Sequence, residues 1–171
     1  QNDAYALMRA GMTPATQFLD VMGSYADEDD ATVWADLASN LRGLESLLAD
    51  EPALASYRRF TGDLFKRIAG RVGWDTIPGE GHLDALRRST VLSQRAYYGD
   101  QRLVDEARQR FDNYCADETP LHPDIRGLVF GVVAQYGDRS TYQRLWELEK
   151  SATLSEEKMR LLGALTRFGD E

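Results

Sequence analysis

Cysteine and histidine are scarce in this 171-residue sequence, and their scarcity excludes several kinds of site. The single cysteine, Cys115, rules out an intrachain disulfide, so we expect a reducing, cytoplasmic location. The two histidines, His82 and His122, lie in separate segments, and neither has another histidine or a cysteine at metal-ligand spacing. The H-E-x-x-H motif is absent. We therefore predict no metal site and no catalytic residue within these residues.

Positive charge and long apolar runs are also in short supply. The sequence has 20 Lys and Arg against 28 Asp and Glu, a formal net charge of −8. An acidic surface repels phosphate groups, so we expect neither nucleic acid nor a membrane as a partner. No apolar run approaches the roughly 20 residues that span a bilayer. The hydrophobic content of 43% nevertheless suffices for a packed core.

The apolar residues that are present recur at helical spacing nearly everywhere, whereas the alternating pattern of a β-strand is absent. The segment 33–48 shows the pattern through Val33, Leu37, Leu41, Leu44 and Leu48, which are three or four positions apart. Glycine and proline interrupt the pattern between segments. The sequence predicts an all-α fold with helices at 2–10, 13–24, 30–49, 52–72, 82–98, 100–116, 123–136, 138–150 and 155–168.

An aromatic residue followed by Gly-Asp occurs three times, at 98–100, 136–138 and 168–170. Glycine directly after a helix tolerates the left-handed conformation, and aspartate caps the next helix. We predict that Gly99 and Gly137 end helices in that conformation, and that Asp100 and Asp138 are N-caps. The interval of about 35 residues favours an α-α superhelix of stacked antiparallel helix pairs, a HEAT/ARM-like solenoid. The alternative is a chance recurrence of Gly-Asp at helix ends.

Other conspicuous residues have plain structural interpretations. We expect Trp34, Trp74 and Trp146 in the core, because large aromatic side chains are more often core than ligand platform. Cys115 is expected to be a small buried hydrophobe rather than a nucleophile. The cluster of Glu80, His82 and Asp84 indicates the start of a helix, where acidic side chains are favourable. Thr13 followed by Pro14 predicts an N-cap and the first helical position.

Several stretches resemble one family of enzymes. The zinc aminopeptidases of the puromycin-sensitive type, which are gluzincin aminopeptidases, have similar helical segments in the same order. The resemblance covers essentially the whole sequence, and its most specific part is "GWDTIPGEGHLDALRR" at 73–88. The other stretches are "NDAYALMRAG" at 2–11, "VWADLASNLRGL" at 33–44, "DIRGLVFGVVAQYGD" at 124–138 and "SEEKMRLLGALTRFGDE" at 155–171.

The resemblance implies a role inside a larger enzyme. In that family, a catalytic domain with G-A-M-E-N and H-E-x-x-H motifs precedes a C-terminal helical superhelix. The superhelix resembles HEAT repeats and closes a chamber that admits peptides and excludes folded proteins. Residues 1–171 would then form a single helical domain, a fragment of this cap. Its partners would be the upstream catalytic domain and peptide substrates, and zinc would be bound outside the fragment. The alternative is a freestanding α-solenoid that binds a protein partner and has no enzymatic role.

Two arginines match positions of the family pattern, and a third departs from it. Arg88 and Arg126 match family arginines, whereas Arg87 stands where relatives have an apolar residue. A guanidinium fork fits a carboxylate, so Arg88 and Arg126 are candidates to line a substrate path, with His82 as a further candidate. The alternative, which we favour, is that the arginines are structural links between helices or to an acidic neighbour.

Overall fold

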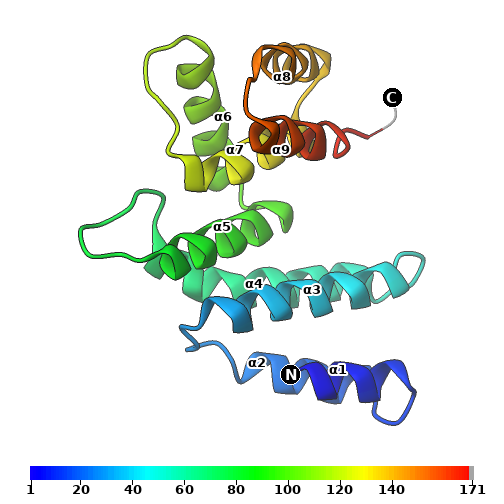
Figure 1. Cartoon of the computed structure of the whole chain (residues 1–171). Coiled ribbons are helices and arrows are strands. Elements are labelled where there is room, and N and C mark those ends of the chain that lie inside the picture. Colours follow the sequence, from blue (N-terminus) through cyan, green and yellow to red (C-terminus); the bar gives the residue numbers. More distant parts are fainter. Residues whose placement is uncertain (170–171) are drawn as a thin grey trace. The chain divides into compact units, whose positions relative to one another are not determined.

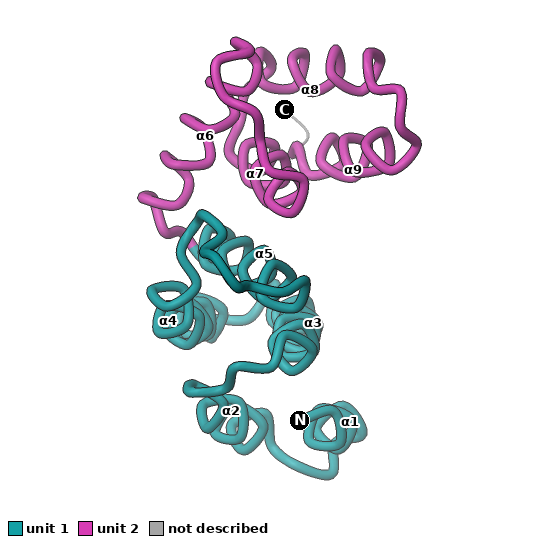
Figure 2. Tube along the Cα trace, turned by 60° about the vertical axis from the view of Figure 1, so that its left-hand side comes forward, with its two compact units in different colours: residues 1–98 teal, residues 99–171 magenta. Residues whose placement is uncertain are grey.

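The computed structural model describes residues 1–169, and every regular element in that range is helical (Figure 1). The prediction of an all-α fold is therefore confirmed. The chain divides into two compact units, Gln1–Tyr98 and Gly99–Glu171, shown in different colours in Figure 2. The single domain predicted over 1–171 stays a prediction. The first aromatic-Gly-Asp motif coincides with the boundary between the two units.

The first unit contains five helices. They are α1 (Asn2–Arg9), α2 (Ala15–Gly23), α3 (Ala31–Leu47), α4 (Leu54–Val72) and α5 (His82–Tyr97). Each lies within two residues of its predicted bounds. Helix α3 packs against α1, α4 and α5, and α4 packs against α5, as neighbours joined by short connections do. One cap differs from the prediction: Pro14, not Thr13, is the N-cap residue of α2, and it offers no side-chain cap.

Aromatic side chains form the centre of the first unit. The rings of Trp34 and Phe65 lie 5.3 Å apart at a tilt of 52°. Trp34 is fully buried and donates its indole N–H to the carbonyl oxygen of Glu28 at 2.9 Å, so its one polar atom is satisfied. Asp30 caps α3 by accepting the N–H groups of Thr32 and Val33, and these backbone bonds lower the pKa of its carboxyl.

The second unit has four helices among its described residues. They are α6 (Gln101–Cys115), α7 (Pro123–Tyr136), α8 (Arg139–Ser151) and α9 (Ser155–Leu165). Helix α7 is mostly buried and packs against the other three. Phe130 on α7 meets Phe111 edge-on at 6.1 Å. Helix α9 ends at Leu165, three residues before the predicted end at Phe168, and Phe168 instead packs on Tyr142 with the ring centroids 5.2 Å apart.

The aromatic-Gly-Asp motif ends and begins helices at two of its three occurrences. Gly99 has φ +91° and follows α5, and Asp100 accepts the N–H of Arg102 at the start of α6. Asp138 likewise accepts the N–H of Thr141 at the start of α8. In the third motif, Gly169 does not directly follow a helix, and Asp170 lies outside the described residues. Within each unit, neighbouring helices pack as a solenoid requires, and a HEAT-like superhelix over the whole chain stays a prediction.

The predicted left-handed conformation of Gly137 is wrong. Its φ of −89° and ψ of 167° are extended, so the chain leaves α7 without a left-handed turn. Glycine is required at this position because there is no room for a side chain. A Cβ would collide with the carbonyl oxygen of Val133 and would lie 2.7 Å from Cγ2 of Thr141.

Three side chains are less buried than we expected, and one of them is Trp74 in the segment 73–81, which is only partly buried. Trp146 on α8 is 38% exposed, because α8 buries only Leu145 fully. Its ring stacks on Tyr142, one turn earlier, with the ring centroids 6.4 Å apart. Cys115, at the end of α6, is half-buried, and this burial raises the pKa of its thiol, which makes it a poor nucleophile.

Glycines in the second unit provide a matched test of the steric argument. Gly137→Ala should destabilise the chain by about 1–3 kcal/mol, the usual cost of overpacking. Gly163→Ala is the control, because its Cβ would enter open space on α9 and alanine favours a helix by about 1 kcal/mol. Chemical denaturation of both variants measures the difference. Equal free energies of unfolding would show that the space around Gly137 does not constrain the fold.

The N-cap at Asp138 should give a pH-dependent contribution to stability. The Thr141 N–H and the Ser140 and Thr141 hydroxyls lower the pKa of its carboxyl to about 2. A lowered pKa stabilises the fold above the unfolded value of about 3.9, and the contribution is lost as the pH falls through about 2. The melting temperature of Asp138→Ala should therefore lie below that of the wild type at pH 6, and the gap should narrow towards pH 2. A gap independent of pH would contradict this assignment.

Candidate functional site

Arg88 is buried inside the first unit, where it links two helices and a loop. It lies on the inward face of α5, and its side chain is 1% exposed. Its Nε atom donates to the carbonyl oxygen of Val72, the last residue of α4, at 3.2 Å. Its Nη2 atom donates to the Glu80 carboxylate at 2.5 Å. This arrangement is the one expected of a structural link, which we favoured over a substrate-lining role.

The segment 73–81 is held against α5 by the same carboxylate. Glu80 also accepts the N–H of Ile77 at 3.1 Å, and the Arg88 hydrogen bond lowers the pKa of the Glu80 carboxyl. Asp84, in the first turn of α5, accepts the N–H of Gly81 at 2.9 Å. His82 starts α5 on the exposed surface, so it does not join this network. A cavity of about 310 Å³ lies between the segment and the ends of α4 and α5.

Arg87, the arginine that departs from the family pattern, also donates hydrogen bonds to neighbouring segments. Arg87 donates to the carbonyl oxygen of Asp29 at 2.5 Å and to Asp84 at 3.1 Å. Arg71 on α4 pairs with the carboxylate of the same Asp29. The segment before α3 is thereby tied to the α4–α5 corner, which gives Arg87 a structural role of its own.

Arg126 occupies a comparable but less buried position in the second unit. Its side chain is 26% exposed and lies over the ring of Tyr114, with 5.7 Å between the guanidinium carbon and the ring centroid. Its Nε atom donates to the carbonyl oxygen of Leu121 at 3.1 Å, and its Nη1 atom lies 3.3 Å from Glu157. Glu157 is also paired with Arg160 at 2.6 Å. Arg126 therefore shares its acidic partner.

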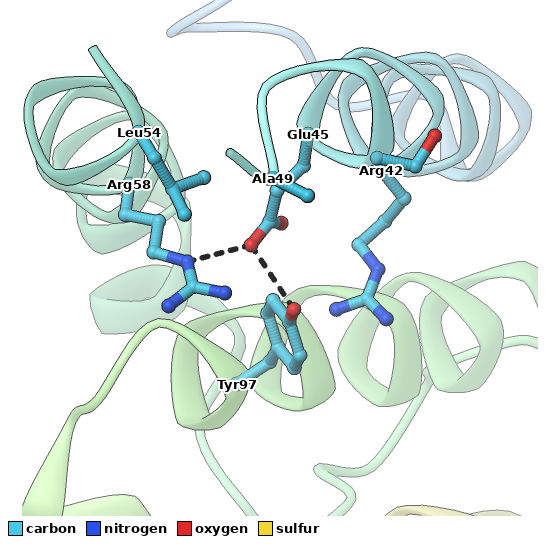
Figure 3. A pocket seen from close by; sticks show the side chains of 7 residues that line it. Arg42, Glu45, Ala49, Leu54, Arg58 and Tyr97 are labelled. Carbon is cyan, nitrogen blue, oxygen red and sulfur yellow. Dashed lines mark hydrogen bonds and ion pairs between the residues drawn. The ribbon is translucent and has the colours of Figure 1, made fainter. Parts of the chain in front are cut away.

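A further cluster, which we did not predict, surrounds Glu45 on α3. Glu45 is 5% exposed and accepts three hydrogen bonds, of which Figure 3 draws those from Arg58 and Tyr97. Arg58 on α4 donates at 2.7 Å, and the hydroxyls of Tyr97 and Tyr98, at the end of α5, each donate at 3.1 Å. The bond to Glu45 raises the pKa of the Arg58 guanidinium. One sequence signal pointed to this cluster: Glu45 adjoins Leu44 on the apolar stripe, and a carboxylate is rarely buried there without partners.

Arg42, one turn before Glu45, completes this cluster. Its guanidinium carbon lies 3.5 Å from the centroid of the Tyr97 ring, a close cation–π contact. A pocket of about 260 Å³ opens beside it. The residues that line this pocket are Arg42, Glu45, Ser46, Ala49, Leu54, Arg58 and Tyr97. Two guanidinium groups and one carboxylate thus face a small cavity, whose local charge is positive in an acidic protein.

The described residues do not fit a zinc site. Between residues 1 and 169, no three side chains of histidine, cysteine, aspartate or glutamate come together in a group that could hold a metal ion. A catalytic zinc needs about three protein ligands. In the same range, no helix has both the length and the apolar character needed to cross a bilayer.

Comparison with known proteins shows the family of this chain. The sequence model of the ERAP1-like C-terminal domain matches residues 1–171, so the chain belongs to that family. Similar proteins are Aminopeptidase M1-A of Oryza sativa subsp. japonica, 36% identical, and Aminopeptidase M1 of Arabidopsis thaliana, 34% identical. Puromycin-sensitive aminopeptidase of Caenorhabditis elegans is 31% identical. Each alignment covers 99% of this chain but only 18–20% of the relative. The resemblance to aminopeptidases is confirmed, and the chain spans about a fifth of their length.

The two family arginines should differ in their contribution to stability. Arg88→Met should cost about 3 kcal/mol, because removing one member of a buried ion pair leaves its partner uncompensated. Arg126→Met should cost about 1 kcal/mol, because Arg126 is partly exposed and Glu157 keeps its pair with Arg160. Urea denaturation of the two variants measures the difference.

A second substitution controls for the charge left behind by Arg88→Met. Adding Glu80→Gln should restore part of the lost stability, because the neutral amide needs no cation. If Arg88→Met is as stable as the wild type, Arg88 is not a structural link, and its assignment moves to the substrate side.

Proposed function

We propose that this chain is the non-catalytic C-terminal cap of a cytoplasmic, zinc-dependent aminopeptidase that removes N-terminal residues from peptides. The observation that carries the proposal is the alignment: nearly the whole chain matches a minor part of each aminopeptidase relative. The catalytic residues and the zinc ligands would then lie in the remainder of the parent protein. In this proposal the cap encloses the chamber that contains the active site and limits which substrates enter it.

The contacts of the described residues support the role of a rigid wall. Guanidinium groups link elements of the first unit: buried Arg88 on α5 bonds to Glu80 in the preceding loop, and half-exposed Arg58 on α4 bonds to the buried Glu45 on α3. Side-chain caps start α3, α6 and α8. A wall built in this way can exclude a folded protein by size while an extended peptide passes. Excluding bulk water from the chamber would also strengthen electrostatic interactions at the zinc.

The isolated chain and the parent enzyme should behave differently. We expect the purified 171-residue chain to bind no stoichiometric zinc and to leave an aminoacyl reporter uncleaved, since zinc catalysis needs about three grouped ligands. The coding sequence upstream of Gln1 should contain the G-A-M-E-N and H-E-x-x-H motifs. A complete reading frame without them would instead favour the freestanding α-solenoid.

Removal of the cap tests the gating role directly. In the parent enzyme, deleting residues 1–171 should raise the kcat/KM for a folded protein with an accessible N-terminus relative to that for a tripeptide. Zinc content and hydrolysis of a short reporter show whether the remaining domains are intact. Adding the 171-residue chain in trans should restore the original ratio. An unchanged ratio in an intact deletion variant would refute the gating role.

A further inference from the structure

Four apolar residues at the corner between α4 and α5 are exposed to solvent. Ile77 is 66% exposed in the middle of the segment 73–81, which Figure 1 shows as the open loop before α5, and Pro78 beside it is also exposed. Leu83 and Leu86, on the first turns of α5, are 62% and 47% exposed. Single exposed apolar residues are ordinary, but such a concentration indicates a contact surface. We call Ile77, Pro78, Leu83 and Leu86 the corner patch.

The segment that carries Ile77 is held in one shape before any partner binds. Glu80 accepts the N–H of Ile77 and is in turn fixed by Arg88, which is almost fully buried. Gly79 has φ +96°, a conformation that residues with a side chain rarely adopt. Ordering a flexible loop weakens binding, whereas this loop has already lost its freedom on folding. The corner patch is therefore preorganised for contact.

A cavity of about 310 Å³ adjoins the patch, and its charges are already matched. Val72, Ile77 and Pro78 form the apolar part of its wall. The arginines that line it are Arg71, Arg87 and Arg88, and their carboxylate partners are Asp29, Glu80 and Asp84. Because each guanidinium is paired, the cavity has no surplus charge to attract an ion. The group that fits is an uncharged, apolar side chain, which gains by leaving water and breaks no ion pair.

The length of the relatives indicates what covers the patch. The chain spans only 18–20% of each aminopeptidase relative named above, so about four-fifths of such a protein lies outside it. A stable contact between two parts of a protein has an apolar centre inside a polar rim, and the corner patch offers such a centre. A second copy of the chain is a poorer partner, because each copy carries a net charge of −8 and the two repel each other.

We propose that the corner patch is the surface through which this chain contacts the catalytic domain of the parent protein, with an apolar side chain of that domain inserted in the cavity. The identity of the partner rests on the proposed function, whereas the surface rests only on the geometry of α4, α5 and the segment between them. This contact fixes the cap at its α4–α5 corner and leaves the other helices to enclose the chamber.

Hydroxyl-radical footprinting measures whether the patch is covered in the intact parent. The reaction rates of the Ile77, Leu83 and Leu86 side chains are compared between the purified 171-residue chain and the full-length parent. We expect each rate to fall several-fold in the parent, because a covered side chain is out of reach of dissolved radicals. Met12 is the control, since it is 72% exposed in the same unit but outside the patch, and its rate should stay the same.

A photo-crosslinker identifies the partner. Ile77→p-benzoylphenylalanine in the full-length parent should join the chain to a peptide upstream of Gln1, within the domain that contains the zinc motifs. Adding Leu83→Ser and Leu86→Ser together should lower the yield of this product by about tenfold or more, because less apolar surface is buried in the contact. Met12→Ser should leave the yield unchanged. All these side chains are exposed, so the isolated variants should unfold at the same urea concentration as the wild type.

Three results would overturn the proposal. The first is an unchanged reaction rate for the patch in the parent, and the second is an equal fall for the patch and for Met12. The third is a cross-link to residues 99–171 or to a second copy, either of which would make the patch a contact of this chain with itself. None of them refutes the proposed function, which fails instead if the reading frame lacks the zinc motifs. In that case the footprint still shows whether an upstream domain covers the patch.

Discussion

The buried carboxylate of Glu45 is the constraint that organises the first unit. A carboxylate removed from water costs several kcal/mol unless its oxygens are bonded and its charge is balanced. Here α4 supplies the balancing charge through Arg58, and α5 supplies two hydroxyls. Burial raises the pKa of the Tyr98 phenol far above its ordinary value, so this hydroxyl remains a donor at any physiological pH. Glu45 therefore joins α3, α4 and α5 at one point.

Arginine side chains make most of the polar contacts between elements. Arginine is also far more abundant than lysine in this sequence. The sequence has 17 arginines and three lysines. A guanidinium can pair with a carboxylate and bond to a carbonyl oxygen at the same time, which a compact ammonium does less well. Arg88 bonds to the carbonyl of Val72 and Arg108 to that of Tyr136, and these are the last residues of α4 and α7. The last carbonyls of a helix lack partners within it, so these arginines satisfy groups that would otherwise need water.

The helices were predictable from the sequence because their signals are local. Apolar spacing and terminal residues such as Asp100, Pro123 and Asp138 decide where a helix runs, and all three lie at helix starts. The conformation of Gly137 was not predictable, because it depends on contacts with Val133 and Thr141 rather than on the preference of glycine for a left-handed turn. The spacing of apolar residues along α8 does not show which face of the helix a neighbouring helix covers. The prediction that Trp146 is buried failed for this reason.

The pocket beside Glu45 depends on contacts that no local pattern contains. Its arginines come from α3 and α4 and its tyrosine from α5, and Arg42 and Tyr97 are far apart in the sequence. The family pattern directed attention to Arg88 and Arg126, which the structure places in different units. A carboxylate on an apolar stripe was the one sign of the cluster available beforehand. It indicates that partners exist but cannot identify them.

The unequal burial of its three tryptophans gives the chain an intrinsic fluorescent probe. Trp34 is fully enclosed in the first unit, whereas Trp74 of the same unit and Trp146 of the second unit are partly exposed. An enclosed indole emits at shorter wavelength and is shielded from a dissolved quencher such as iodide, while an exposed one is not. Loosening of the first unit would shift the emission to the red and admit the quencher, whereas loosening of the second would change little. The order in which the two units lose their structure can thus be followed without attaching a label.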